Sequence, residues 1–409
     1  MSHSSKAPPE AFTVTYAFNS ISFPDTCTPS HTPQFGHSSY LSVPHTLRGS
    51  ETCYSSFQDG VEGFPFNNCV GSIVEDSIAY STYQDTAVAA LSVASNLSHK
   101  DLILPNEEGL KLLGIFMKNS PEWIVSEQAA YANDAAVVPL YSTLGATAIE
   151  FILEQTQLTT VVCTSTELKQ LLELKRRSPN LALKNVVLCG VPVPTPLPET
   201  SLAIHSLSDF KTQPFPGFSP SPPSATSLAT ICYTSGTTGD PKGVLLTHSN
   251  FVAVASACLE GVINLTETDV HYSYLPLAHI FERTMQVGLY KCGSSVVFGS
   301  GDVKNLQKEL MLVKPTIFIA VPRVLQKFHD GVMSQVKKAD AMKQNVFNMA
   351  LGQKLEALKV NQLSHPQWDG MVFGSVKAKI GLENVRFVLT GGASISGERQ
   401  LVSLVKYRS

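Results

Sequence analysis

The sequence predicts an α/β protein built from two subdomains, each a mostly parallel sheet flanked by helices. Short apolar runs, typical of buried strands, alternate with segments whose apolar residues recur at helical spacing. A proline-rich stretch over 191–227 interrupts this alternation. We therefore expect a poorly structured N-terminal extension over 1–48, a first α/β subdomain over 49–190, a connector over 191–227 and a second α/β subdomain over 228–409.

The first half supplies strands and helices in alternation. Apolar residues at helical spacing predict a helix over 81–97, and the apolar run LKLLGIFM predicts a buried strand over 110–117. Ser120 is a suitable N-cap, and Pro121 a suitable first-turn residue, for the helix that follows. The remaining expected elements are strands over 135–139, 159–163 and 185–190 and helices over 147–155 and 168–174.

The connector contains nine prolines between residues 191 and 227. Because proline fixes φ and lacks a backbone donor, we expect no regular structure there. The α/β alternation then resumes. The expected strands cover 228–232, 244–246, 270–274, 295–298, 316–321 and 385–390, and the expected helices cover 249–261, 279–290, 305–313, 323–330 and 331–360.

Composition narrows the function classes. The formal net charge is −3, whereas nucleic-acid-binding proteins usually present a basic face, so we expect no nucleic-acid partner. The eight cysteines are scattered without ligand spacing, which favours a reducing compartment over a disulfide scaffold or zinc site. No apolar run approaches the ~20 residues that span a bilayer, and the N-terminus does not resemble a secretory signal. We expect a cytoplasmic protein, with any membrane contact peripheral, on the endoplasmic reticulum or another organelle.

The most informative stretch is YTSGTTGDPKGVLLTH, residues 233–248. Its glycines permit close backbone approach, its hydroxyls and amides are donors, and Lys242 adds positive charge, which together suit a polyphosphate. The loop is longer than the roughly two to five residues of an ordinary hairpin turn. A Walker P-loop is excluded, because Asp240 and Pro241 separate Gly239 from the lysine and a strand-like run follows.

This stretch resembles the phosphate-binding signature of the adenylate-forming (AMP-binding) superfamily, which includes acyl-CoA synthetases, luciferases and peptide-synthetase adenylation domains. The resemblance implies that the loop binds the triphosphate of ATP and that Lys242 stabilises charge on the β- and γ-phosphates. The implied phosphate-binding residues are Thr234, Ser235, Gly236, Thr237, Thr238 and Gly239.

Three further stretches resemble the long-chain acyl-CoA synthetase branch: YLPLAHIFER over 274–283, VPRVLQKF over 321–328 and VPLYSTLG over 138–145. This resemblance implies that His279 lies near the carboxylate and acyl pocket. LTGGAS over 389–394 matches the segment that borders adenine, which implies nucleotide contacts for Gly391, Gly392 and Ala393.

The same residues also have simpler interpretations. His279 could be a helix cap, and Gly391 and Gly392 a strand-end turn. Glu282 and Arg283 are better explained as partners of other charges than as chemical groups.

The implied reaction joins a long-chain fatty acid to ATP as an acyl-adenylate, with Mg²⁺ on the phosphates, and coenzyme A then displaces AMP. The family's aromatic-Gly-x-Thr-Glu motif, its ribose-binding aspartate and its C-terminal lysine domain do not occur in the 409 residues. We therefore expect a large N-terminal domain that is incomplete and shows no turnover by itself. The alternatives are an inactive truncated isoform or pseudoenzyme that binds nucleotide or fatty acid, and another adenylate-forming enzyme. LPLAHIFER and VPRVLQKF argue against that last alternative.

Overall fold

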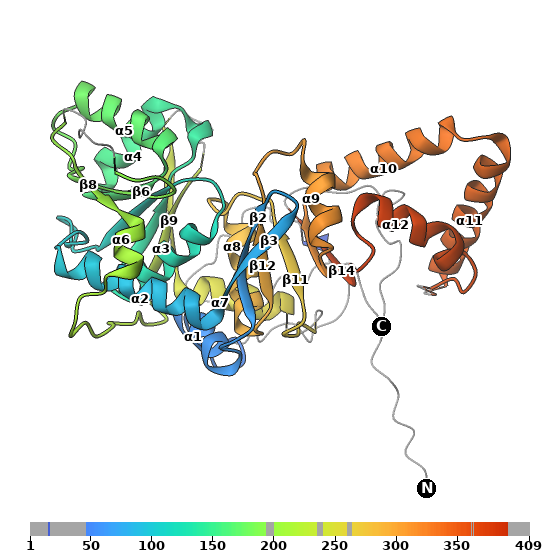
Figure 1. Cartoon of the computed structure of the whole chain (residues 1–409), viewed down its shortest axis with the longest axis horizontal. Helices are drawn as coiled ribbons and strands as arrows, with labels where there is room; N and C mark the ends of the chain where they lie inside the picture. The colour runs from blue at the N-terminus through green and yellow to red at the C-terminus, as the bar shows by residue number, and fades with distance from the viewer. Residues whose placement is uncertain are drawn as a thin grey trace, which may run out of the picture.

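The computed structural model describes residues 15–16, 46–193, 200–234, 240–259, 264–360, 362 and 364–391. Two seven-stranded sheets, mostly parallel, lie side by side with helices between them and on their outer faces (Figure 1). The predicted α/β fold class is confirmed.

The first sheet has the strand order β10-β9-β5-β4-β6-β7-β8, and only the β9/β10 pair is antiparallel. Its strands β4, β5 and β6 are buried along their whole length, because helices cover both faces. The strands are β4 (Leu112–Phe116), β5 (Ala136–Pro139), β6 (Thr160–Cys163), β7 (Asn185–Leu188), β8 (Ala203–Ser206), β9 (Leu228–Thr234) and β10 (Lys242–Thr247). The helices on the two faces are α2 (Tyr83–His99), α3 (Pro121–Tyr131) and α6 (Leu207–Thr212) on one side and α4 (Ala146–Thr156) and α5 (Ser165–Arg177) on the other.

The second sheet has the order β1-β14-β13-β11-β12-β2-β3, and only the β2/β3 pair is antiparallel. Its strands are β1 (Thr15–Tyr16), β2 (Asn68–Val74), β3 (Ser77–Thr82), β11 (Val270–Ser273), β12 (Ser295–Phe298), β13 (Ile317–Ala320) and β14 (Phe387–Gly391). Its helices α1 (Cys53–Gly63), α7 (His248–Leu259) and α8 (Ile280–Lys291) share one hydrophobic core with α2 and α3, so this helical layer joins the two sheets. Helix α9 (Leu306–Val313) packs on the opposite face.

Each sheet contains strands from both sides of the proline-rich segment. Strands β9 and β10 belong to the first sheet although they follow that segment, and β2 and β3 belong to the second although they precede it. The hydroxyl of Thr230 in β9 donates to the carbonyl of Val137 in β5, 2.7 Å away, within the buried sheet. The division into 49–190 and 228–409 stays a prediction about domains, but it does not describe which strands pair.

The expectation of no regular structure over 191–227 is wrong for its middle. Strand β8 and helix α6 lie there. All nine prolines fall within 192–198 and 214–223, which leaves 199–213 with its backbone donors intact. Leu207 and Phe210 are buried and attach this helix to the first half.

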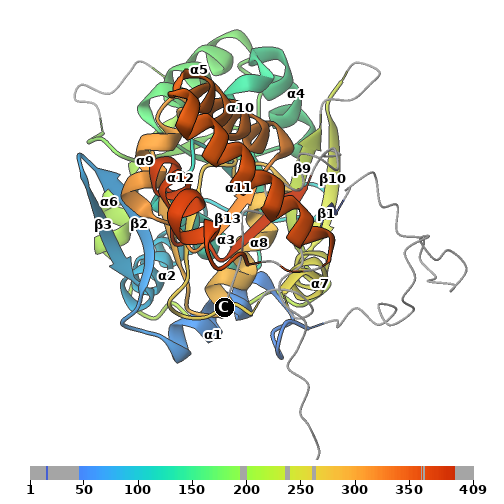
Figure 2. The same ribbon diagram turned by 90° about the vertical axis from the view of Figure 1, so that its right-hand side faces the viewer.

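A set of helices over 322–380, named here the helical arm, projects from the second sheet away from the first (Figures 1 and 2). It comprises α10 (Pro322–Lys338), α11 (Ala341–Lys359), η3 (Asp369–Phe373) and α12 (Gly374–Ile380). The break between the long helices lies at 339–340, not at the predicted 330–331. The reason is local: a carboxylate oxygen of Asp340 accepts from the backbone N–H of Lys343 at 2.9 Å and so caps a new helix.

Candidate active site

The ends of the phosphate-loop motif are fixed by an antiparallel strand pair. Thr234, the last residue of β9, lies opposite Lys242, the first residue of β10, and the Thr234 hydroxyl is 3.5 Å from the Lys242 carbonyl oxygen. Both residues are exposed at the mouth of the loop. The other predicted phosphate-binding residues, Ser235, Gly236, Thr237, Thr238 and Gly239, lie outside the described residues.

Tyr141 connects this strand pair to the second sheet. Its hydroxyl lies 3.2 Å from the carbonyl oxygen of Tyr233 and 3.2 Å from that of Ala278, so it can donate to either. Burial raises the pKa of Tyr141 above its ordinary value, and the hydroxyl therefore keeps its proton at neutral pH. The loop stem and the LPLAH segment are thus held next to each other.

His279 stands immediately after Ala278, at the start of α8. Its side chain makes no cap hydrogen bond, which does not support the helix-cap interpretation. The ring centroid is 5.2 Å from that of Tyr141. His279 is exposed, yet enough protein surrounds its ring to lower its pKa by desolvation, which favours the neutral imidazole.

Asn119 positions the segment that leads to His279, and sequence reasoning missed it. It follows β4 of the first sheet and binds backbone after β11 of the second. Its Nδ2 donates to the carbonyl of Leu275 at 2.7 Å, and its Oδ1 accepts from the N–H of Leu277 at 2.8 Å. Its position between an apolar strand and a capped helix marked a strand-to-helix loop, but no local pattern indicated a partner 158 residues away.

Glu282 and Arg283 are structural, as the simpler interpretation predicted. Glu282 is fully buried, with its Oε1 2.8 Å from Nε2 of His271. Arg283 Nη2 lies 2.6 Å from Oε1 of Glu127, and the guanidinium also donates to the hydroxyls of Thr230 and Tyr131. Protein groups in the core between the sheets thus satisfy the Arg283 guanidinium, whereas Oε2 of Glu282 is buried without a hydrogen-bond partner among the described residues.

Gly391 ends β14, next to the carboxyl end of β13. Gly392 and Ala393 lie outside the described residues. The carboxyl ends of β11, β13 and β14 thus lead directly into the LPLAH, VPR and GGA stretches. This is the edge where parallel α/β sheets usually bind ligands.

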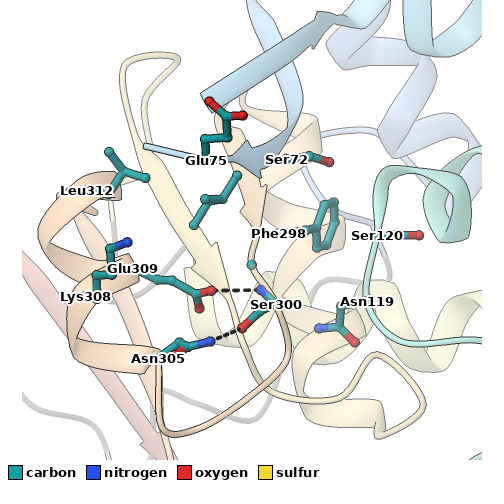
Figure 3. Close-up of a pocket in the computed structure, with 12 residues that line it drawn as sticks. Ser72, Glu75, Asn119, Ser120, Phe298, Ser300, Asn305, Lys308, Glu309 and Leu312 are labelled. Atoms are coloured by element: carbon teal, nitrogen blue, oxygen red, sulfur yellow. Dashed lines mark hydrogen bonds between the residues drawn. The ribbon is translucent and has the colours of Figure 1, made fainter. Parts of the chain in front are cut away.

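A cavity lies elsewhere along the same edge. It has a volume of about 420 Å³ and lies beyond β2 and β12, with Asn119, Phe298, Ser300 and Glu309 among its lining residues (Figure 3). The carboxylate of Glu309 accepts from the backbone N–H of Ser300 at 2.9 Å and from the hydroxyl of Tyr272. None of the predicted site residues that the structure describes lines this cavity, whereas Asn119 both lines it and binds the LPLAH segment.

Metal ligation is a separate question. Within the described part of the chain, no group of three or more His, Cys, Asp or Glu side chains is arranged to hold a metal ion.

Comparison with known proteins decides the family. The model of the family described as AMP-binding enzyme matches residues 61–402. The chain belongs to the AMP-binding enzyme family. This confirms the resemblance found in the phosphate-loop motif.

Two curated relatives show how much of their length this chain covers. The chain is 33% identical over 367 residues to long-chain-fatty-acid–CoA ligase 5 of Rattus norvegicus, covering 85% of this chain and 51% of that protein. It is 35% identical over 355 residues to the peroxisomal long chain acyl-CoA synthetase 7 of Arabidopsis thaliana, covering 84% and 49%. It therefore spans about half the length of these relatives.

Solved structures share the fold of this chain. The adenylation domain of a carboxylate reductase from Mycobacterium chelonae superposes with a TM-score of 0.69 at 16% identity, covering 87% of this chain and 56% of that one. The N-terminal domain of FACL13 from Mycobacterium tuberculosis gives a TM-score of 0.61 at 16% identity, covering 86% and 73%. Among the described residues, no helix has the length and apolarity needed to cross a membrane.

Proposed function

We propose that this chain forms the ATP-binding and carboxylate-binding part of a long-chain fatty acid–CoA ligase. The observation that carries the proposal is the contact of the Tyr141 hydroxyl with both Tyr233 and Ala278. It holds the mouth of the phosphate loop next to His279, so one ligand could touch both. The names of the relatives at 33–35% identity support the substrate class.

Lys242 would bind the β- and γ-phosphates of ATP. It is exposed at the mouth of the loop, and its flexible ammonium can follow the charge that develops on pyrophosphate as that group leaves. The hydroxyl of Thr234 stands directly across the strand pair from it. The glycine- and hydroxyl-rich residues 235–239 would supply the remaining donors.

His279 would orient the fatty-acid carboxylate. A neutral imidazole can donate one hydrogen bond to a carboxylate without fixing it as an ion pair. The carboxylate oxygen would attack the α-phosphorus, form the acyl–phosphate bond and release pyrophosphate. The thiol of coenzyme A would then displace AMP. In such an in-line displacement, positioning and charge neutralisation supply most of the catalysis. Gly391, Gly392 and Ala393 would border the adenine.

Nucleotide binding provides the first test. We expect ATP to bind the full chain in calorimetry and Lys242→Ala to weaken that binding about tenfold or more, as loss of a charge-assisted contact does. Lys304→Ala, at another exposed lysine, is the matched control and should bind ATP normally. Undetectable binding by the unmodified chain, or equal affinity in Lys242→Ala, would refute the proposal.

Turnover separates the ligase from the second candidate, a protein that binds nucleotide or fatty acid without reaction. The assay traps acyl-adenylate as hydroxamate, using ATP, palmitate and hydroxylamine. Product that depends on Lys242 would establish adenylation by this chain. ATP binding without product is the outcome expected of an incomplete ligase domain by itself, and it would leave the second candidate open, as the sequence does.

A further inference from the structure

The outer face of α11 carries an apolar stripe. Met342, Val346 and Met349 are 78%, 38% and 50% exposed, and their spacing of four and three residues places them on one side of the helix. A neighbouring side of α11, about 100° around the helix, is packed, because Phe347 and Ala350 lie in a small core with the segment around η3. The stripe itself is not covered by this core.

The same arm has a charge opposite to that of the whole protein. Residues 322–380 contain nine lysines or arginines and four aspartates or glutamates, a net charge of +5, whereas the whole chain has −3. The remainder of the chain is thus at −8. The excess positive charge therefore belongs to the helical arm, and the rest of the chain, called here the body, is acidic.

Positive and apolar groups meet where α10 turns into α11. Lys337 and Lys338 are exposed in the last turn of α10, and Met342 is exposed in the first turn of α11, where Lys343 pairs with Asp340 at 2.8 Å. This turn lies at the end of the arm farthest from the first sheet (Figure 1), and the arm stands in front of the sheets when viewed from that end (Figure 2). A flat surface could reach it without touching the acidic body.

We infer that this turn and the apolar stripe of α11 form a docking surface for an anionic lipid membrane. Lysines near an anionic bilayer are attracted by its surface potential, while methionine and valine side chains enter the boundary between headgroups and acyl chains. Each signal by itself gives weak binding, and the two occur here side by side, the lysines at the end of α10 and the apolar stripe on α11. An acidic lipid surface matches the charge of the arm and would repel the body, so the arm would bind end-on.

This inference does not rest on the proposed function. Vesicle binding is measured without ATP or fatty acid, so either idea can fail while the other stands. If both hold, docking places a fatty-acid-binding site beside the membrane in which fatty acids partition.

The test is co-sedimentation of the full chain with phosphatidylcholine vesicles that contain about 30% phosphatidylserine or none. We expect binding to the anionic vesicles, little binding to the neutral ones, and release at ~1 M salt, where the screening length falls to ~3 Å. Met342→Glu/Val346→Glu and Lys337→Glu/Lys338→Glu should each weaken binding about tenfold or more. All four positions are exposed, so these variants should fold.

Two variants at the other end of the molecule are the controls. Val88→Glu changes an exposed valine of α2, and Arg176→Glu/Arg177→Glu makes the same charge change on α5. Both should bind anionic vesicles as the unmodified chain does. If the control variants weaken vesicle binding as much as the arm variants do, the docking surface does not lie on the helical arm.

Absence of binding to anionic vesicles, or equal binding to neutral ones, would overturn the inference. A second copy of the chain is the competing occupant. Self-association in light scattering that Met342→Glu/Val346→Glu abolishes, combined with no vesicle binding, would assign the surface to that copy.

Discussion

The guanidinium of Arg283 lies 2.6 Å from the carboxylate of Glu127, and both groups are inside the protein. Arg283 belongs to α8 of the second sheet and Glu127 to α3 of the first. The pair therefore joins the two halves of the molecule through charge as well as apolar packing. It also stands one residue along the chain from Glu282 and four from His279, so it fixes the helix on which the candidate site begins.

Arg283→Met should lower the free energy of unfolding by about 3–5 kcal/mol, because it leaves the Glu127 carboxylate buried without its partner. Urea denaturation measures this. Arg176→Met, which breaks an exposed pair with Glu173, is the control and should cost less than about 1 kcal/mol. The double variant Arg283→Met/Glu127→Gln should lose less than Arg283→Met. Additive losses in the double variant would contradict the pairing.

Tyr141→Phe should weaken ATP binding severalfold while costing only about 1 kcal/mol of stability, since it removes one hydroxyl that spans the two sheets. Calorimetric titration with ATP is the measurement. Tyr233→Phe offers the matched comparison, because its hydroxyl donates to Gln155 at 2.6 Å and lies within the first half. If both variants bind ATP equally well, the contacts of the Tyr141 hydroxyl have no role in nucleotide binding.

Asn119→Ala should loosen the LPLAH segment and cost about 2 kcal/mol, because backbone groups of Leu275 and Leu277 lose their partner. Hydrogen exchange should show faster exchange at the Leu277 amide. Asn305→Ala removes an amide that donates to the hydroxyl of Ser300 and should leave the Leu277 amide protected. Unchanged protection in Asn119→Ala would show that other contacts hold this segment.

Acid should destabilise the protein partly through His248. Burial, together with the Arg283 charge, lowers the pKa of His248 from 6.5 to about 3. Below about pH 6.5 the unfolded chain therefore binds a proton at His248 that the folded chain does not bind. The contribution of neutral His248 to stability is complete above about pH 6.5 and is lost as the pH falls towards 3. At about pH 5 the loss from this group reaches about 2 kcal/mol.

Urea denaturation at about pH 7.5 and pH 5 measures this effect. His248→Gln should be less stable at the higher pH but should lose less on acidification than the unmodified chain. His329→Gln, at a partly exposed histidine, should lose as much stability on acidification as the unmodified chain does. An equal acid loss in His248→Gln would show that other groups account for it.

Continuous apolar runs made the buried strands predictable. The run over 112–116 is buried on both faces, so hydrophobicity by itself marks a strand there. By contrast, β2 and β3 were not predicted, since β3 has serine, threonine and tyrosine residues that are largely exposed. Helix α1 was missed because its sequence CYSSFQDGVEG is mostly polar, and only a capping box of Thr52 and Ser55 marks its start.

The candidate site likewise contains residues that the sequence predicted and residues that it did not. Thr234, Lys242 and His279 could be predicted, because they belong to contiguous motifs with a recognisable chemistry. Tyr141 lies within a stretch that resembles the family, but its role depends on carbonyls 92 and 137 residues along the chain. Asn119 depends on a segment more than 150 residues away. A single sequence has no signal for pairings of this range, since loop closure and sheet packing create them.

The pairing of Thr234 with Lys242 also separates folding from ligand recognition. Because the two strands already hold the ends of the loop, the chain entropy of closing residues 235–241 is lost whenever the sheet forms. Lengthening such a closed segment is inexpensive, at roughly 0.6 kcal/mol for each doubling. Folding therefore places little demand on the length of this segment, so its residues can be selected for binding a nucleotide.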